Sequence, residues 1–338
     1  QAGGRTRMGK TGDSLALGID LGGTKILSSV MDAKGKLLSR NQRMTPAAQG
    51  KEAVIQAMIE SARGSLTEAN VTPAELTAIG IGAPGLSNPR TGVIYTSPNL
   101  PGWKDVPLKD IFATELRQPT YIINDANAAA VGELYYGAGK GARDFIYITV
   151  STGIGGGIII DGEIYAGSTG TAGELGHMVI DDDGPLCHCG NKGCWEMLAS
   201  GTALANEAKR QIQGGAATSL SQLAGGADAI NAQAIHKAAL AGDELAKKLI
   251  NRNAYYLGVG LANLINIFNP EAIVIGGGLS NIGDMLLLPA YEEAGRRAFK
   301  RPLQDTRFAR AELGGDSGVI GAAAYALEEL GKSKRRRK

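Results

Sequence analysis

The segment "GELGHMVIDDDGPLCHCGNKGCWEMLA", residues 173–199, contains every cysteine of the chain and two of its three histidines. Cys187, Cys189 and Cys194 are close enough in sequence to bind one metal ion, and thiolates favour zinc among the common cellular metals. Three cysteines and one histidine fill a tetrahedral site and leave no position open for water, which is typical of structural zinc. No C-x-x-C motif is present, so thiol exchange is disfavoured. We therefore expect a structural zinc site in this segment.

The fourth zinc ligand is His177 or His188. His188 lies between two cysteines and would have difficulty folding back onto the same tetrahedron, so we favour His177. The three aspartates at 181–183 are interpreted as a solvated loop. Glu174 and Glu196 lie within three residues of expected ligands, so the metal would also fix where their carboxylates lie.

Two glycine-rich turns could bring backbone N–H groups close to a phosphate. The first is "GIDLGGTK", in which the candidate residues are Asp20, Gly22, Gly23, Thr24 and Lys25. The second is "STGIGGG", with Thr152 and Gly153 as its candidates. Asp-x-Gly-Gly also occurs in ordinary hairpins, but two such turns at equivalent places favour phosphate binding. Neither turn is a Walker or dinucleotide-binding motif.

An aspartate at the end of an apolar strand is the candidate catalytic group. In "IINDANAAA" the strand ends at Asn124 and Asp125, directly before an alanine-rich helix. Asp125 could simply cap that helix. However, α/β enzymes keep their chemistry at the carboxyl ends of strands, where Asp125 could accept the proton of an attacking hydroxyl. The loop "SPNLPGW" adds Asn99 as a candidate for binding a polyhydroxylated ligand.

The elements around these residues predict two related α/β lobes. Strands come first, then helix and strand alternate up to residue 136; a second strand pair opens on "STGIGGG". Helices are expected over about 201–213 and 229–268. The predicted N-terminal lobe is residues 15–123, completed by a C-terminal helix at 318–330, and the larger lobe is residues 124–317 with the zinc-binding segment 177–194. The segment at 1–14 is expected to be disordered or vector-derived, and the basic tail at 331–338 is expected to be disordered.

The charge distribution argues against a general nucleic-acid surface. The formal net charge of the chain is +2, the first 14 residues carry +2 and the last eight carry +6, so the remaining body carries −6. No apolar stretch approaches the length of a membrane span, and no secretory signal is recognisable. We expect a cytoplasmic protein without a specific nucleic-acid or membrane partner.

Several motifs together resemble the ROK family (repressors, open reading frames and kinases). They are "DLGGTK", "GAPG", "NDANAAAVGE", "STGIGGGI", "GELGHM" and "CHCGNKGCWE", in the order and spacing of that family from about residue 15 to 330. The resemblance implies a two-lobed actin-like (ribonuclease H-like) ATPase fold with a cleft between the lobes. "SPNLPGW" resembles the sugar loop of the family's bacterial glucokinases, which implies ATP-dependent phosphorylation of glucose at its 6-hydroxyl with Mg²⁺.

The resemblance also implies a role for each candidate. Asp125 matches the catalytic base, and the sugar-binding set is Asn99, Asn124, Asp125, Glu174, His177 and Glu196. The zinc ligands are His177, Cys187, Cys189 and Cys194. The cofactor-binding set comprises the two turns (Gly22, Gly23, Thr24, Lys25, Thr152 and Gly153), Asp20 near the metal–phosphate group, and Gly277 and Gly278 on the adenosine side.

Other members of the family leave alternatives. Kinases for N-acetylmannosamine, N-acetylglucosamine, mannose or fructose share almost every motif. Sugar-responsive repressors of the family carry a helix-turn-helix domain, for which the 14 residues before the first strand are too few. The resemblance further suggests a homodimer or homotetramer.

Overall fold

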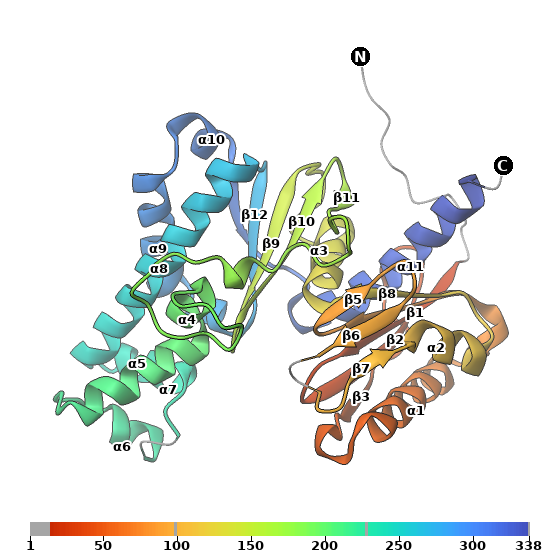
Figure 1. Cartoon of the computed structure of the whole chain (residues 1–338), viewed down its shortest axis with the longest axis horizontal. Coiled ribbons are helices and arrows are strands. Elements are labelled where there is room, and N and C mark those ends of the chain that lie inside the picture. Colours follow the sequence, from red (N-terminus) through yellow and green to blue (C-terminus); the bar gives the residue numbers. More distant parts are fainter. Residues whose placement is uncertain (1–13, 98–99, 227–228, 337–338) are drawn as a thin grey trace. The chain divides into compact units, whose positions relative to one another are not determined.

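The computed structural model describes residues 14–97, 100–226 and 229–336, which form two compact α/β units (Figure 1). The first unit takes the described residues within Gln1–Arg143, Gly157–Gly173 and Glu312–Lys338, and the second takes those within Asp144–Gly156 and Glu174–Ala311. The expected boundary at residue 123 therefore differs from the structure. Residues 124–143 belong to the first unit because the helix that they contain packs along the C-terminal helix of that unit.

The first unit is built on a five-stranded sheet of order β3-β2-β1-β4-β8. Strands β1, β4 and β8 are parallel, whereas β2 pairs antiparallel with both β1 and β3. A separate sheet has the order β5-β6-β7. The strands are β1 (Leu15–Leu21), β2 (Lys25–Met31), β3 (Asn41–Met44), β4 (Leu76–Ala83), β5 (Leu86–Asn88), β6 (Val93–Thr96), β7 (Lys104–Val106), β8 (Thr120–Asn124) and β11 (Glu163–Ile164). The helices are α1 (Lys51–Ala69), α2 (Leu108–Leu116), α3 (Asp125–Tyr136) and α11 (Ser317–Arg336).

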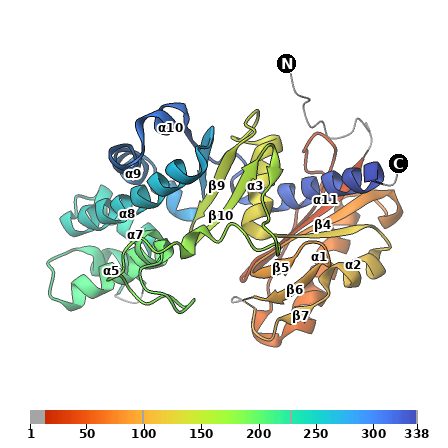
Figure 2. The same cartoon turned by 45° about the horizontal axis from the view of Figure 1, so that its top comes forward.

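The two faces of strand β1 pack against different helices, because successive side chains of a strand point to opposite faces. Leu17 and Ile19 are fully buried in the cluster that includes α1 and α2. Ala16, Gly18 and Asp20 alternate with them on the face covered by α11, which lies beside β4 in Figure 2. The alternation thus places the Asp20 carboxylate on the α11 side of the sheet.

Helix α11 lies so close to its neighbours that only glycine fits at the contacts. A Cβ atom at Gly18 would lie 2.1 Å from the carbonyl oxygen of Val319, and one at Gly80 would lie 1.8 Å from that of Ala322. On the opposite side, a Cβ at Gly321 would lie 1.6 Å from the carbonyl oxygen of Ala128 on α3. Helix α11 is therefore packed between the sheet and α3, backbone against backbone.

The second unit contains strands β9 (Phe145–Val150), β12 (Ala272–Gly276) and β13 (Arg307–Arg310), with β12 parallel to both neighbours. Strand β10 (Ile154–Ile160) begins beside β9 and continues into the first unit, where it turns at Asp161-Gly162 into β11. The helices are α4 (Trp195–Ala199), α5 (Gly201–Gln213), α6 (Leu220–Ala224), α7 (Ala232–Leu240), α8 (Glu244–Phe268), α9 (Asp284–Arg297) and α10 (Lys300–Asp305). The short 3₁₀ turns within the described residues of both units are η1 (Ala47–Gln49), η2 (Pro73–Glu75), η3 (Leu175–His177), η4 (Gly278–Ile282) and η5 (Gly314–Asp316).

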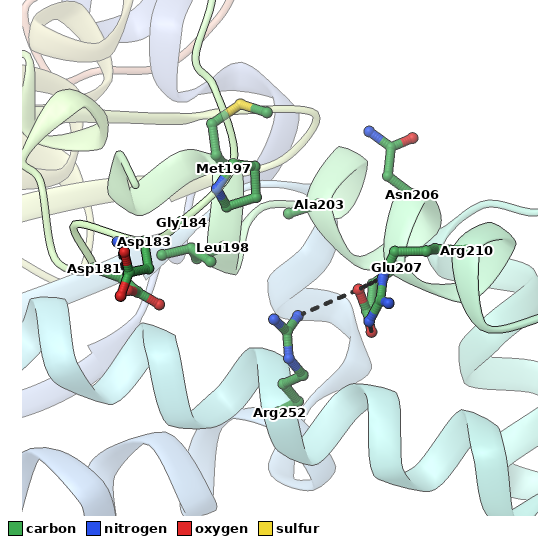
Figure 3. Close-up of a pocket in the computed structure, with 11 residues that line it drawn as sticks. Asp181, Asp183, Gly184, Met197, Leu198, Ala203, Asn206, Glu207, Arg210 and Arg252 are labelled. Atoms are coloured by element: carbon green, nitrogen blue, oxygen red, sulfur yellow. Dashed lines mark hydrogen bonds and ion pairs between the residues drawn. The ribbon is translucent and has the colours of Figure 1, made fainter. Parts of the chain in front are cut away.

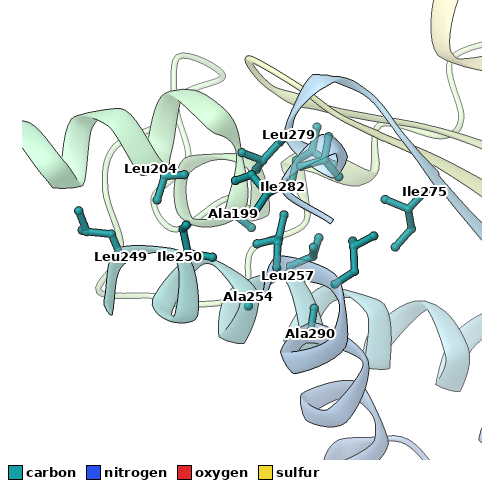
Figure 4. Packing of buried hydrophobic residues seen from close by; sticks show 14 of the residues in the cluster. Ala199, Leu204, Leu249, Ile250, Ala254, Leu257, Ile275, Leu279, Ile282 and Ala290 are labelled. Carbon is teal, nitrogen blue, oxygen red and sulfur yellow. The ribbon is translucent and has the colours of Figure 1, made fainter. Parts of the chain in front are cut away.

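The core of the second unit is centred on α8, a helix of 25 residues. Its buried side chains, among them Ile250, Ala254 and Leu257, pack against α4, α5 and α9 (Figure 4). The single helix expected over 229–268 is divided into α7 and α8, because Asp243 caps a new helix by accepting a hydrogen bond from the Ala246 N–H at 2.9 Å.

The basic segment after residue 330 differs from the expected disordered tail. Helix α11 continues to Arg336, and the Lys332 ammonium lies 2.6 Å from Glu328, 3.2 Å from Glu329 and 3.3 Å from Glu163. The pairs with Glu328 and Glu329 lie within the helix, and the pair with Glu163 joins its last turns to β11 of the first unit. The expected disorder at 1–14 falls, apart from Ser14, outside the described residues. None of the helices in the described ranges combines the length and apolarity needed to cross a membrane.

Candidate functional site

The three cysteines and His177 form one compact cluster. Their sulfur and ring-nitrogen atoms all lie within 4.8 Å of one another. Cys189 Sγ is 3.5 Å from Cys194 Sγ, and Cys187 Sγ is 3.6 Å from His177 Nδ1. Two thiolates at about 2.3 Å from a tetrahedral zinc ion lie roughly 3.8 Å apart, so the donor atoms have the chemistry and approximate spacing of a Cys₃His zinc site.

The loop that holds these ligands depends on a glycine. Gly193 has a φ of 68°, and a Cβ there would lie 1.6 Å from the carbonyl oxygen of Asp181. Hydrogen bonds from Cys187 N to Asn191 O at 2.7 Å and from Ile180 N to Gly193 O at 3.0 Å close the loop. The backbone therefore brings the cysteines together through turns that a side chain at position 193 would block.

His188 lies beside the cysteine cluster but outside its four-residue group. Its Nδ1 is 4.0 Å from Cys187 Sγ, and with His177 and Glu196 it forms a second group of donor atoms within 4.8 Å of one another. Its side chain is 65% exposed, and its Nε2 is 3.5 Å from Glu196 Oε1. The aspartates of the same segment are not all solvated as expected: Asp182 and Asp183 are exposed, but Asp181 is half-buried and accepts a hydrogen bond from the Tyr256 hydroxyl at 3.3 Å.

Glu196 connects the cysteine cluster to the "STGIGGG" turn. Its side chain is only 12% exposed. Its Oε2 accepts a hydrogen bond from Ile154 N at 3.4 Å, and a Cβ at Gly153 would lie 2.6 Å from the same oxygen. Glycine at 153 therefore makes room for this carboxylate. Glu174 is exposed directly before η3, at the end of which His177 lies.

A cavity of about 430 Å³ lies beside this turn, within the second unit. Gly201 N donates to Ser151 O at 2.7 Å, so the N-terminus of the 13-residue helix α5 meets the turn at the cavity wall. The residues that line the cavity include Thr152, Thr202, Asn206, Lys209, Asn231 and Gly278. Helix N-termini and backbone N–H groups favour anions, so the cavity suits a phosphorylated ligand.

Several of the lining residues carry no motif and were missed by sequence reasoning. Asn231 caps α7 by accepting a hydrogen bond from Ala234 N at 2.9 Å, and this helix-capping role is the one signal that the sequence offers at that position.

Gly277, which the resemblance placed on the adenosine side, has a φ of 87°, and a Cβ there would lie 2.4 Å from Val150 O. Glycine at 277 therefore allows a close backbone approach between the segment after β12 and the end of β9.

A second cavity, of about 470 Å³, lies between the loop at 181–185 and helices α4, α5 and α8 (Figure 3). Glu207 occupies one end and is held by Arg210 at 2.6 Å and by Arg252 at 3.8 Å. The hydrogen bonds from Arg210 lower the pKa of the Glu207 carboxyl. The carboxylate is thus paired with two arginines inside the protein, which is typical of a structural ion-pair cluster.

In the first unit, Asn124 and Asp125 have different structural roles at the end of β8. The Asn124 side chain caps α3 by accepting hydrogen bonds from Ala126 N at 3.0 Å and Asn127 N at 3.2 Å. Asp125 is therefore the first residue of the helix rather than its cap. Burial raises the pKa of the Asp125 carboxyl, and the hydrogen bond from the Ala126 N–H opposes that rise.

Asp20 lies at the end of β1 and interacts electrostatically with Asp125. Burial, and secondly the negative charge of Asp125, raise the pKa of Asp20 to about 7, against the opposing effect of Lys25. The first turn of α11 lies against this carboxylate, since a Cβ at Gly318 would be 2.7 Å from Asp20 Oδ2. Two neighbouring carboxylates with raised pKa values are typical of a functional site that binds a cation or accepts a proton.

The turn after Asp20 is closed by backbone hydrogen bonds, with Gly22 N donating to Lys25 O at 2.9 Å. Thr45, directly after β3, fixes the turn by donating its hydroxyl to Gly22 O at 2.7 Å. Thr24 and Lys25 are exposed at its tip. Asn99, on the candidate sugar loop, lies outside the described residues.

Each unit thus begins with neighbouring strands joined by a glycine-rich turn that carries polar groups. Two α/β units of this kind define the actin-like, ribonuclease H-like ATPase fold. A sequence model of the ROK family matches residues 16–329, and the chain belongs to that family.

The individual relatives agree with this assignment. A glucokinase of Halalkalibacterium halodurans is 39% identical over 91% of this chain and 94% of its own length. A ROK family glucokinase of Streptomyces griseus, solved in complex with glucose and AMPPNP, superimposes with a TM-score of 0.80 at 36% identity, covering 93% of this chain and 99% of that one. A xylose repressor of Caldicellulosiruptor bescii is 32% identical over 93% of this chain, but this chain covers only 78% of its length.

Proposed function

We propose that this protein is an ATP-dependent glucokinase that transfers the γ-phosphoryl group of ATP to the 6-hydroxyl of glucose. The observation that carries the proposal is the pair Asn124 and Asp125 at the carboxyl end of β8. Asn124 satisfies the helix N-terminus, so the Asp125 carboxylate is not required as the cap. The similarity to curated glucokinases at up to 39% identity supports glucose as the acceptor.

Asp125 is the general base in this mechanism. Burial raises the pKa of its carboxyl, which makes the ionised form a stronger proton acceptor than an exposed aspartate. It takes the proton of the 6-hydroxyl as that oxygen attacks the γ-phosphorus, and the bond from phosphorus to the bridging oxygen of ADP breaks. Asn99, Asn124, Glu174, His177 and Glu196 bind the remaining hydroxyls of the sugar.

The nucleotide is held by the second-unit cavity, which Thr152 and Gly278 line, and by the glycine turns. Thr152, Gly153 and the N-terminus of α5 bind the phosphates, whereas Gly277 and Gly278 contact the adenosine. Gly22, Gly23, Thr24 and Lys25 contribute the turn of the first unit. Mg²⁺ neutralises phosphate charge in such reactions. Asp20, whose pKa is raised to about 7 in the ligand-free protein, is the carboxylate that would hold it, through water.

The cluster of His177, Cys187, Cys189 and Cys194 is proposed to bind a structural zinc ion. Four protein ligands close the coordination shell, so the metal has no part in the transfer itself. Its effect is geometric, because it fixes the segment from which Glu174, His177 and Glu196 reach the sugar.

An ADP-release assay coupled to oxidation of NADH, run across a panel of sugars and phosphoryl donors, tests the proposal. We expect glucose with ATP to be the preferred pair and ³¹P NMR to identify glucose 6-phosphate as the product. Turnover of N-acetylmannosamine, N-acetylglucosamine, mannose or fructose far above glucose would overturn the choice of substrate. No turnover of any sugar, together with sugar-dependent and salt-resistant binding of DNA, would favour a regulator instead.

We further propose a cytoplasmic enzyme that assembles as a homodimer or homotetramer. Sedimentation velocity measures the second part directly, and a single species of monomer mass across micromolar concentrations would contradict it.

A further inference from the structure

Trp195 lies in sequence between an expected zinc ligand and an expected sugar ligand, and its side chain packs against helix α8. It follows Cys194, precedes Glu196 and is fully buried. Its indole Nε1 donates a hydrogen bond to the carbonyl oxygen of Tyr256 on α8 at 2.9 Å, and its backbone N donates to Met178 O at 2.8 Å. The side chain is thus anchored in helix α8.

Helix α8 has a glycine where the indole rests. A Cβ at Gly260 would lie 2.0 Å from Cε2 and 2.4 Å from Cζ2 of Trp195. Glycine is a poor residue for the interior of a helix, and alanine is preferred there on propensity alone. The steric fit of the indole therefore accounts for glycine at position 260.

The same helix also holds the other end of α4. Asn253 lies about one helical turn before Tyr256 on α8, and its Nδ2 donates to the carbonyl oxygen of Ser200 at 3.2 Å. Helix α8 therefore contacts α4 at its first residue, through Trp195, and at its C-cap, through Ser200. Ala199, Ala254 and Leu257 belong to the buried cluster between these contacts (Figure 4).

We propose that Trp195 is a positioning residue for sugar recognition, and that its fit against Gly260 sets the location of the Glu196 carboxylate. The inference rests on the proposed role of Glu196 in binding the sugar. Helix α4 has five residues and is too short to be stable alone, so its position depends on what holds it. The cysteine cluster holds Cys194 from one side, and α8 holds Trp195 and Ser200 from the other.

The substitution Gly260→Ala tests this positioning from a residue outside the expected sugar-binding and phosphate-binding sets. The added Cβ must displace the indole, and α4 moves with it. We expect the Kd for glucose, measured by calorimetry without ATP, and the KM for glucose to rise about tenfold, which equals the loss of one charge-assisted hydrogen bond. The KM for ATP should stay within about twofold of wild type, because the loss concerns the sugar alone.

Gly258→Ala is the matched control on the same helix. A Cβ at Gly258 would lie 2.6 Å from Ala290 O and 2.6 Å from Glu293 Cβ, so it disturbs the contact with α9 instead. Both variants should lose thermal stability, but only Gly260→Ala should weaken glucose binding selectively. Equal effects of the two variants on the glucose Kd would overturn the proposal.

A second-site change gives an independent test. Phenylalanine at 195 removes part of the ring system that the new Cβ would strike, so Trp195→Phe combined with Gly260→Ala should bind glucose more tightly than Gly260→Ala alone. Absence of any recovery would count against the steric coupling. Each Kd and KM of a variant is expressed as a ratio to the wild-type value for the sugar that the wild-type protein accepts. If glucose is not the substrate, the sugar panel on the wild-type protein shows it, and these ratios are unaffected.

Discussion

The substitution Asp20→Asn should make the ligand-free protein more stable while removing its activity. Asp20 is half-buried near Asp125, and its pKa is raised from 3.8 to about 7, first by burial and then by the Asp125 charge. At about 1.4 kcal/mol per pKa unit, that rise corresponds to about 4 kcal/mol of unfavourable free energy when the carboxylate is ionised in the folded protein. Partial exposure to water makes this figure an upper bound.

The sign of the pH dependence follows from proton binding. The unfolded chain loses the Asp20 proton near pH 3.8, whereas the folded chain keeps it up to about pH 7. Between these values the folded state binds more protons, so the free energy of unfolding falls as the pH rises and is level above about pH 7. Asparagine does not titrate. The variant should match wild type near pH 4 and exceed its stability increasingly up to pH 7.

Urea denaturation of the ligand-free protein at several pH values between 4.5 and 8.5 measures this difference. Asp110→Asn, at an exposed position on α2 of the same unit, is the control for removing a carboxylate and should change the free energy of unfolding by less than about 0.5 kcal/mol. The reasoning is refuted if Asp20→Asn is no more stable than wild type at pH 8, or if its advantage is equal at pH 5 and pH 8.

Three further outcomes are expected. Asp125→Asn should lower kcat by roughly 10²–10⁴-fold while calorimetry still detects glucose binding, and a near-normal kcat would remove Asp125 from the mechanism. Zinc chelation should raise the KM for glucose and lower the melting temperature, and an unchanged KM and melting temperature would contradict the geometric role of the metal. By metal analysis, His188→Ala should keep one zinc per chain, whereas His177→Ala should lose it. Gly80→Ala places a Cβ 1.8 Å from Ala322 O and should cost roughly 1–3 kcal/mol in unfolding free energy, so a loss below about 0.5 kcal/mol would show that α11 is held differently.

The parts of the site that sequence could predict are those whose chemistry is local in the chain. The spacing of Cys187, Cys189 and Cys194 predicted that their sulfur atoms come together, as they do in the structure, because all three lie within one loop; the metal ion stays a prediction. The place of Asp125 at the junction of a strand and a helix was predictable because an apolar strand ends directly before it, and its catalytic role stays a prediction. In both cases a few consecutive residues carry the whole signal.

The remaining parts depend on contacts between distant segments. Asn231 and Lys209 line the cavity beside Thr152, but no motif marks them, since they arrive there only through the packing of α5 and α7. The boundary of the first unit was misplaced because it depends on α3 packing against α11, nearly two hundred residues later in the chain. The helical end of α11 depends likewise on the pairing of Lys332 with Glu163.

The packing of α11 against the glycines of β1 and β4 has a consequence for synthesis of the chain. These strands are made first, and the helix that covers them is made only after the whole second unit. During translation the first unit therefore has an open apolar face, while the second can already close its own core. Until the last helix is made, the nascent chain exposes these strands, and transiently exposed strands and apolar surface are prone to aggregation. Expression yield of this protein should depend on how quickly its last helix reaches its place, and a chaperone that shields the first sheet would improve it.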